Sequence, residues 1–377
     1  MVGRFVLMLA VLIGLLALPA AAEETMPDFS APLAEFYAAI PDDLRQALPE
    51  SLFGESMPNG DALRAASTLP ELVEHIRDAL RASLPDAGHL FGQICLCLLF
   101  SALFETVCTA FVGGEMQDVV RMLGQLCAAC LLLGAQMRQL ELIIDCLQQI
   151  RLLMGTMLPL MGAVLASGGN VGTAASGCGS LLLFLNLSEN LCNAVFLPLI
   201  AASSGLAAVA WLPSAERLRG ICACLKRITH WSIGLFGAIF SAVMAAQTIL
   251  SAGADSVAAR TVKFAVGSAV PIIGGVVGDA VRTLTASVGY LKDTIGIFGI
   301  LLLILLALPP LCGILLHRAV LILGSAMAEL LGCTGEKRML EEMGAVSGSL
   351  LSVLCVSLLC FVFSLLIFVR IVPAMGG

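Results

Sequence analysis

The sequence predicts an all-α, polytopic membrane protein with an internal duplication containing paired Pro/Gly-broken helices, preceded by a small helical exoplasmic segment. The 377 residues are 59% hydrophobic and 12% charged, and the mean hydropathy is +0.99. An average globular domain carries ~25% charged residues, so this chain has more apolar surface than one soluble core can hide. Several apolar windows are also long enough to cross the ~30 Å hydrocarbon core of a bilayer.

Residues 1–22 have the layout of a cleavable secretory signal peptide. Arg4 forms a short basic start, "FVLMLAVLIGLLAL" is the apolar region, and "PAAAE" places small residues ahead of Glu23. This order predicts cleavage after Ala22, with an uncleaved signal anchor as the alternative.

Residues 23–88 have a soluble, acidic composition. They hold 13 Asp or Glu against four Arg, a local charge of −9. Prolines stand where short helices could begin, and "PELVEHIRDALRASL" places Leu72, Ile76 and Leu80 on one helical face. We therefore expect a small helical exoplasmic segment, and because about 60 residues make a thin core, it should pack on the membrane or on a partner.

Residues 89–377 are predicted to form a multi-span membrane domain with at least six crossings. Its apolar windows are Leu90–Val112, Val119–Met137, Cys178–Trp211, Trp231–Ser251, Ile295–Leu316 and Val346–Ile371. The third window is too long for one straight crossing, so Pro198 is expected to break or kink it.

One loop between the windows suggests the orientation of the domain. Ser214–His230 holds four basic residues, with apolar residues at helical spacing. This pattern predicts a surface-lying amphipathic helix on the cytoplasmic side of the membrane. No motif resembles a nucleic-acid reader, so no nucleic-acid partner is expected.

A shift of 112 residues aligns two Pro/Gly segments. It places "GTMLPLMGAVLA", Gly155–Ala166, on "GSAVPIIGGVVG", Gly267–Gly278. The same shift predicts duplicated units at about 119–230 and 231–345, followed by a C-terminal span at 346–371. In lipid, a broken helix survives only where protein or a water-lined cavity covers it, and paired breaks are typical of a transporter's central site.

The residues that carry this prediction are Pro159, Gly162, Pro271, Gly274 and Gly275. The alternative is that the glycines only allow helices to pack closely. Whether the two units are parallel or inverted stays open at this point.

Two stretches carry a resemblance to a known family. "ARTVKFAVGSAVPIIGGVVGDA", Ala259–Ala280, and more weakly "NLSENLCNAVFLPLI", Asn186–Ile200, resemble the stage III sporulation protein AE family. The resemblance implies a polytopic protein of endospore-forming bacteria that acts with other stage III sporulation membrane proteins. Their complex joins mother cell and forespore across the space between their membranes. It also implies that the N-terminal segment faces that space, and it supplies no catalytic residues.

No enzymatic motif is found. The four histidines form no H-E-x-x-H pair and G-x-S-x-G is absent, so zinc-protease and serine-hydrolase chemistry has no anchor. An aspartyl pair such as Asp255 with Asp279 lacks the expected motif, because Val276 stands where that motif needs glycine. The 14 cysteines lie mostly in apolar windows, where they behave as small hydrophobes. We expect no enzyme, no cofactor and no metal site.

Polar residues within apolar windows are the remaining functional candidates. Glu105 stands in "LFETVCTAF", and Asn186, Glu189, Asn190 and Asn193 recur at helical spacing. An acid that faces lipid at the bilayer centre costs roughly 2.5 kcal/mol or more, so these side chains should face a bundle interior or a cavity. They could bond neighbouring helices, or line a substrate path or assembly contact.

Two further candidates directly follow the second Pro/Gly segment. Asp279 and Arg282 are spaced i, i+3 and can pair on one helix face. They mark either a cavity-facing polar surface or only the membrane edge. Together with the resemblance, these features predict a membrane component of a sporulation-specific, secretion-like channel complex; the alternative is a stand-alone secondary transporter.

Overall fold

The fold is known from a computed structural model. It describes residues 30–48, 52, 63, 68–111, 114–167, 178–179, 182, 185–210, 218–269 and 274–370; the side chains of 108–111, 114–118, 244–269 and 274–288 are among those not described. All regular elements in these ranges are helical.

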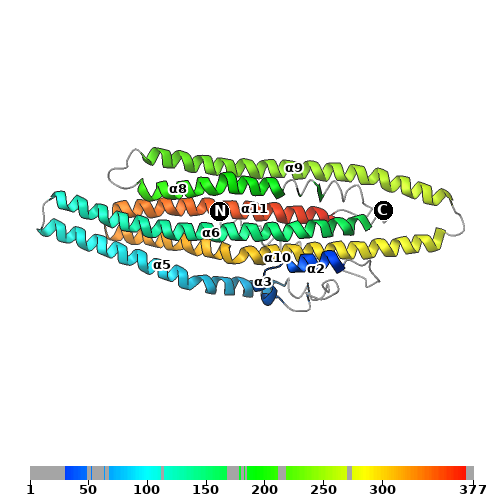
Figure 1. Ribbon diagram of the computed structural model, residues 1–377, viewed down its shortest axis with the longest axis horizontal. Coiled ribbons are helices and arrows are strands. Elements are labelled where there is room, and N and C mark those ends of the chain that lie inside the picture. Colours follow the sequence, from blue (N-terminus) through cyan, green and yellow to red (C-terminus); the bar gives the residue numbers. More distant parts are fainter. Residues whose placement is uncertain are drawn as a thin grey trace.

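The five long helices of the described residues make an elongated antiparallel bundle (Figure 1). They are α5 (Leu69–Phe111), α6 (Gly114–Ser167), α9 (Leu218–Ala269), α10 (Gly274–Leu330) and α11 (Thr334–Arg370). The 57 residues of α10 make a helix of ~85 Å at 1.5 Å per residue. One hydrocarbon core is only ~30 Å thick, so the bundle is longer than any single bilayer.

The predicted class, an all-α polytopic membrane protein, is confirmed. Five helices in the described part of the chain are long and apolar enough to cross a membrane: Pro70–Val107, Val119–Ala166, Leu185–Val209, Gly289–Leu330 and Thr334–Leu366. The further span expected at Trp231–Ser251 runs past Val243, where the described side chains of α9 end, so it stays a prediction.

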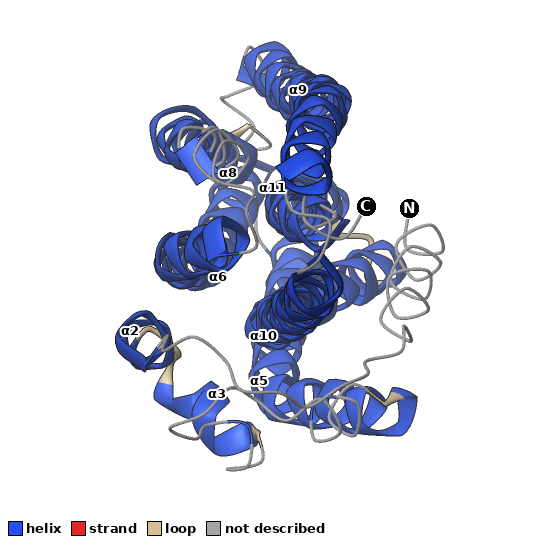
Figure 2. Cartoon of the chain, turned by 90° about the vertical axis from the view of Figure 1, so that its right-hand side faces the viewer, coloured by secondary structure: helices blue, strands red, loops and turns tan. Residues whose placement is uncertain are grey.

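Helices α10 and α11 form the core of the bundle. Figure 2, along the bundle axis, shows α11 between α6, α8 (Leu197–Val209), α9 and α10. On α10 the four consecutive residues 300–303 are all buried. A helix that is apolar on every side is one that protein surrounds. This explains why Gly289–Leu330, the most hydropathic of the five candidate spans, is also among the best covered of them.

Glycines let α10 approach its neighbours closely. A β-carbon at Gly296 would overlap Val369 of α11, and one at Gly299 would overlap Met157 of α6. Small residues at such contacts bring helix backbones together, which is the packing role that the sequence left open for glycine.

The break expected at Pro159 is wrong, because α6 runs through it without interruption. Met157 and Leu160 on either side are fully buried. This packing offsets the loss of the one backbone hydrogen bond, to the Gly155 carbonyl, that proline cannot donate. Gly162 does allow a close approach, since a β-carbon there would lie 2.7 Å from Cys178 Sγ.

The second Pro/Gly segment lies at a helix junction. Helix α9 ends at Ala269 and α10 begins at Gly274, while Pro271 falls outside the described residues. The two aligned segments therefore differ in their surroundings, and the internal duplication stays a prediction.

The expected separate surface helix at Ser214–His230 is not found. The described part of this segment opens α9, which continues unbroken from Leu218 to Ala269. Lys226 forms an ion pair with Glu342 of α11, so tertiary packing holds this part against the bundle.

Pro198 is accommodated by a local irregularity. A π turn, η2 (Cys192–Phe196), stands directly before α8, which has proline in its first turn. Proline cannot donate a backbone N–H, so the helical hydrogen-bond pattern has to change in the preceding turn. The Leu185–Val209 helix thus continues across this point.

The N-terminal segment packs on the bundle. In α2 (Ser30–Ala38), Phe36 and Tyr37 lie edge-on to Phe298 of α10, with ring centroids at 6.0 and 6.4 Å. The short helix α3 (Asp42–Ala47) follows. Helix α5 then crosses the expected boundary at residues 88 and 89 without a break, so its charged first half continues directly into the apolar window.

Candidate functional site

Two contacts set the height of the candidate site along the bundle. Cys146 Sγ of α6 lies 3.9 Å from the Leu306 carbonyl of α10, and Cys192 Sγ lies 3.8 Å from Ser357 Oγ of α11. Leu306 and Ser357 stand near the middle of the windows Ile295–Leu316 and Val346–Ile371. Residues around 146 and 192 are therefore level with the centres of the two most apolar helices.

At this height α6 presents a polar stripe outward. Arg138, Glu141, Asp145 and Gln149 follow one another at three- and four-residue spacing, and all are exposed. The opposite side of the helix is core, with Ile143 fully buried. Helix α6 is thus amphipathic at the level where α10 and α11 are apolar throughout.

The Leu185–Val209 helix continues this stripe beside α6. Asn186, Asn190 and Asn193 are exposed on it, and Glu189 is half-buried. Arg151 Nε of α6 lies 3.0 Å from Glu189 Oε1, so an ion pair joins the two helices. We call this surface the polar face. Its residues are Arg138, Glu141, Asp145, Gln148, Gln149 and Arg151 of α6 with Asn186, Glu189, Asn190 and Asn193.

A small pocket opens where the two helices meet α11. Arg151, Glu189 and Asn193 line it, and about 20 Å³ of it is open to a water-sized molecule. The Ser188 hydroxyl, on the pocket wall, is buried without a partner among the described residues. This space holds about one water molecule, which could satisfy that hydroxyl.

The energetics of the polar face limit what can cover it. Each ionised group placed against lipid at mid-bilayer costs roughly 2.5 kcal/mol or more, and Glu141 and Asp145 are two such groups. The first half of α5 adds further exposed charges, including Asp78 and Arg81. The surface of α9 is apolar, with Trp231, Leu235 and other large side chains exposed. The α9 surface therefore suits lipid, whereas the charged groups of the polar face require water or polar protein.

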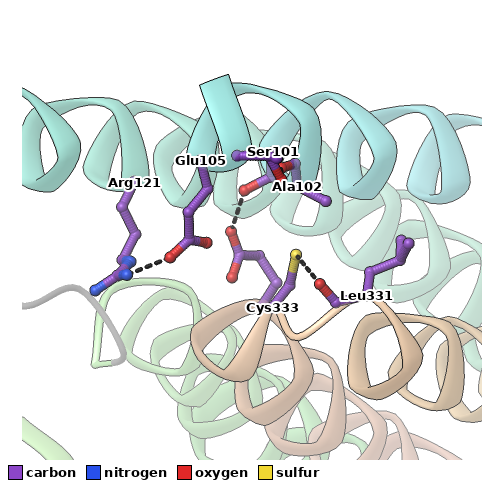
Figure 3. A network of polar contacts seen from close by, with 8 residues as sticks. Ser101, Ala102, Glu105, Arg121, Leu331 and Cys333 are labelled. Carbon is purple, nitrogen blue, oxygen red and sulfur yellow. Dashed lines mark hydrogen bonds and ion pairs between the residues drawn. The ribbon is translucent and has the colours of Figure 1, made fainter. Parts of the chain in front are cut away.

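Glu105 belongs to a separate cluster near the α10–α11 turn (Figure 3). It pairs with Arg121 of α6, while Ser101 Oγ donates to Glu336 Oε1 at 2.7 Å. The turn that brings Glu336 there includes Gly332 at φ 77°, a conformation that favours glycine. Glu105 thus joins α5 to α6, as expected for a polar side chain that bonds neighbouring helices.

A buried polar cluster was missed from sequence. Gln136 of α6 is fully buried; its Oε1 lies 2.8 Å from Ser347 Oγ of α11 and 3.2 Å from His317 Nε2 of α10. The sequence held one signal: each of these residues stands at or directly beside one end of an apolar window, namely Val119–Met137, Ile295–Leu316 or Val346–Ile371. Only the inter-helix register shows that the three ends meet.

The other candidates do not join the polar face. Pro159 is exposed further along α6, and Gly162 faces the Cys178 segment. Gly274, Gly275, Asp279 and Arg282 lie in the first turns of α10. Their side chains are outside the described residues, so the Asp279–Arg282 pairing stays a prediction. Among the residues that the structure describes, no group of three or more His, Cys, Asp or Glu could hold a metal ion.

Comparisons with known proteins agree on one family. Residues 55–372 match the family described as stage III sporulation protein AE. The chain is also 26% identical over 303 residues to the stage III sporulation protein AE of Bacillus subtilis (strain 168), covering 80% of this chain and 75% of that protein. No solved structure matches it.

Proposed function

Because the chain belongs to the stage III sporulation protein AE family, we propose that it is the multi-span component of a sporulation membrane complex. We further propose that the polar face lines a water-filled path in this complex. One observation carries the proposal: charged and amide side chains of α6 and the Leu185–Val209 helix are level with the middle of the apolar spans. Facing a water-filled path, or polar groups of neighbouring subunits, removes the cost of placing those charges in lipid.

The chain alone offers only one wall of such a path. The polar face lies on the outside of the bundle, whereas the helix interfaces are filled by apolar side chains. Further subunits have to close the path. We propose that these are other stage III sporulation membrane proteins or additional copies of this chain, as the family resemblance implies.

The proposed orientation places the N-terminal segment on the exoplasmic side, towards the space between the two membranes. Lys226 pairs with Glu342, and Gly344 lies beside Leu321 of α10. The basic segment is therefore level with Leu321, whereas α2 packs on Phe298. Those α10 positions are about 23 residues, or ~35 Å, apart. That separation matches a hydrocarbon core with the basic residues at its cytoplasmic side.

The stand-alone transporter is the less favoured function. It depended on two broken helices that meet at a central site, and α6 is continuous through Pro159. The residues that gather at mid-span come from α6, the Leu185–Val209 helix and α11 instead.

Thiol labelling tests the water-filled path. Glu141→Cys and Asn190→Cys would be made in the full chain, in sporulating cells that contain the complex. The matched control is Ile239→Cys, a 50% exposed position on the apolar surface of α9. Cells would be treated with a charged methanethiosulfonate, and each cysteine read by peptide mass spectrometry, so that the native cysteines can remain.

We expect the reagent to modify Glu141→Cys and Asn190→Cys at least about tenfold faster than Ile239→Cys, because only thiols in water form the reactive thiolate. Equal, slow labelling at all three positions would show that no water reaches the polar face, and the channel proposal would be abandoned.

A further inference from the structure

The apolar segments of the bundle lie at two different heights. The window Val119–Met137 is centred near Ala128, whereas the α6 residue level with the centre of Ile295–Leu316 is Cys146. These α6 positions are about 18 residues, or ~27 Å, apart. That offset is close to a whole hydrocarbon thickness, so one bilayer cannot cover both levels.

The bilayer level is marked on α9. Trp231 is 70% exposed and begins the apolar part of that helix, directly after the exposed Arg227 and His230. An exposed tryptophan beside basic residues is typical of a membrane–water interface. Lys226, one turn earlier, pairs with Glu342 just before the Val346–Ile371 window. The bilayer therefore surrounds the α9–α11 windows.

The tip of the α5–α6 hairpin extends beyond this level. Cys333 Sγ in the α10–α11 turn lies 3.9 Å from the Leu98 carbonyl of α5, so α5 residues after Ser101 project past that turn. Figure 1 shows the ends of α5 and α6 reaching further than the other helices at the same end of the bundle. The hairpin tip thus lies outside the bilayer, on the side of the basic segment.

The tip and the adjoining turns of α5 and α6 beside the α10–α11 turn carry an exposed apolar surface, the hairpin seam. Its members are large side chains exposed by 43–61%: Leu96, Leu99, Phe100, Leu103, Phe104 and Val107 of α5, with Val119, Met122, Leu123 and Leu126 of α6. Leu96, Phe100, Leu103 and Val107 follow the 4-3-4 spacing by which one helix packs against another. The largest apolar patch on a typical monomer is ~300–600 Å², and ten half-exposed large residues equal or exceed it.

Few charges lie near the hairpin seam. Over residues 90–107 and 119–137 the only charged residues are Glu105 and Arg121, and they pair with each other (Figure 3). Glu115 and Asp118 stand between these two stretches, and their side chains are outside the described residues. Phe100 and Phe104 are already stacked, with ring centroids at 6.2 Å, which reduces the entropy lost on docking.

We propose that the hairpin seam is a self-association surface, on which the α5–α6 hairpin of a second copy of this chain packs. The heptad-like spacing fits a helical partner, and the paired charges fit a second apolar seam better than a charged ligand. The area is on the order of the ~800 Å² per partner of a stable interface. Helix α6 also carries part of the polar face at bilayer level, so joining copies at the hairpin seam brings their polar faces into one assembly.

The test measures the mass of the purified full chain in lipid nanodiscs and in detergent. Wild type is expected to be oligomeric, and Phe104→Glu and Leu123→Glu should each weaken self-association by at least about tenfold. The matched control is Val73→Glu, a 59% exposed position on α5 outside the seam, which should leave the mass unchanged. Circular dichroism of each variant checks that helix content is retained.

A second measurement protects against variants that do not fold. Leu103→Cys, treated with a short bis-maleimide, should give a cross-link between the two introduced cysteines, whereas a cysteine at Val73 should not. The linked peptides are identified by mass spectrometry, because the native Cys127 and Cys130 are also exposed. A wild-type chain that is monomeric in both media would overturn the proposal and leave lipid or another protein as the occupant of the seam. An oligomer that persists unchanged in both seam variants would place the interface elsewhere and overturn it equally.

Discussion

The close approach of α10 to α11 at Gly296 gives the sharpest stability prediction. In the variant Gly296→Ala the new β-carbon would overlap Val369 Cγ2, with Met161 Cε at 3.7 Å on another side. Valine is β-branched and stiff at χ1, so Val369 cannot move aside cheaply. At Gly313 of the same helix, the nearest atom to a new β-carbon is Gln139 Oε1 at 3.7 Å, which is ordinary contact.

The magnitude follows from two opposing effects. Alanine is favoured over glycine in a helix interior by about 1 kcal/mol, and this gain applies at both positions. Overpacking adds a cost of about 1–3 kcal/mol only at Gly296. We therefore expect Gly296→Ala to have a free energy of unfolding about 1–3 kcal/mol below that of Gly313→Ala, and Gly313→Ala to be no less stable than wild type.

The assay is denaturant titration of the purified chain in detergent, followed by helical circular dichroism. A third variant, Gly296→Ala with Val369→Ala, removes the overlapping methyl groups, so the two substitutions should couple favourably in a double-mutant cycle. If Gly296→Ala proves as stable as Gly313→Ala, or the cycle shows no coupling, the close α10–α11 contact does not explain why glycine stands at position 296.

Two further predictions concern buried polar groups. Gln136→Leu leaves His317 and Ser347 without their shared partner, so it should lower the free energy of unfolding by about 1–3 kcal/mol. The control Gln149→Leu changes an exposed residue of the same helix and should alter this free energy little. Equal effects of the two variants would contradict the role of the cluster. Tyr37 donates its hydroxyl to the Leu52 carbonyl, and burial raises the pKa of Tyr37 to about 12. The unfolded chain then loses this proton first, so stability from Tyr37 is complete below pH 10 and is lost as pH rises towards 12. Unfolding measured across that range should show this loss in wild type, and Tyr37→Phe should lack it.

Much of the fold could be predicted from the sequence, because the signals involved are local. Long apolar windows with few charges predict membrane-spanning helices, and five helices among the described residues are long and apolar enough to cross a membrane. The family resemblance, too, rested on local stretches, and the match over residues 55–372 confirms it. The expected separation at residue 88 is not seen as a break, since α5 continues from its charged half into its apolar half.

Part of the candidate site could be predicted and part could not. Glu189, Asn190 and Asn193 were found from sequence, because polar residues at helical spacing are conspicuous within an apolar window. The α6 residues between Arg138 and Arg151 were missed, because they lie between two windows and read as a linker. Their position beside the middle of α10 became visible only from the Cys146–Leu306 contact.

The sequence by itself determined the helical class, the membrane setting and the family, since hydropathy and helix propensity act over neighbouring residues. Only the tertiary structure decided that α6 continues through Pro159, that Arg151 pairs with Glu189, and that Gln136, His317 and Ser347 meet. The physical reason is register. How far each helix slides along its neighbours depends on which side chains pack, as at Gly296 and Gly299. That sliding decides which polar residues share one height and which apolar surfaces one bilayer can cover.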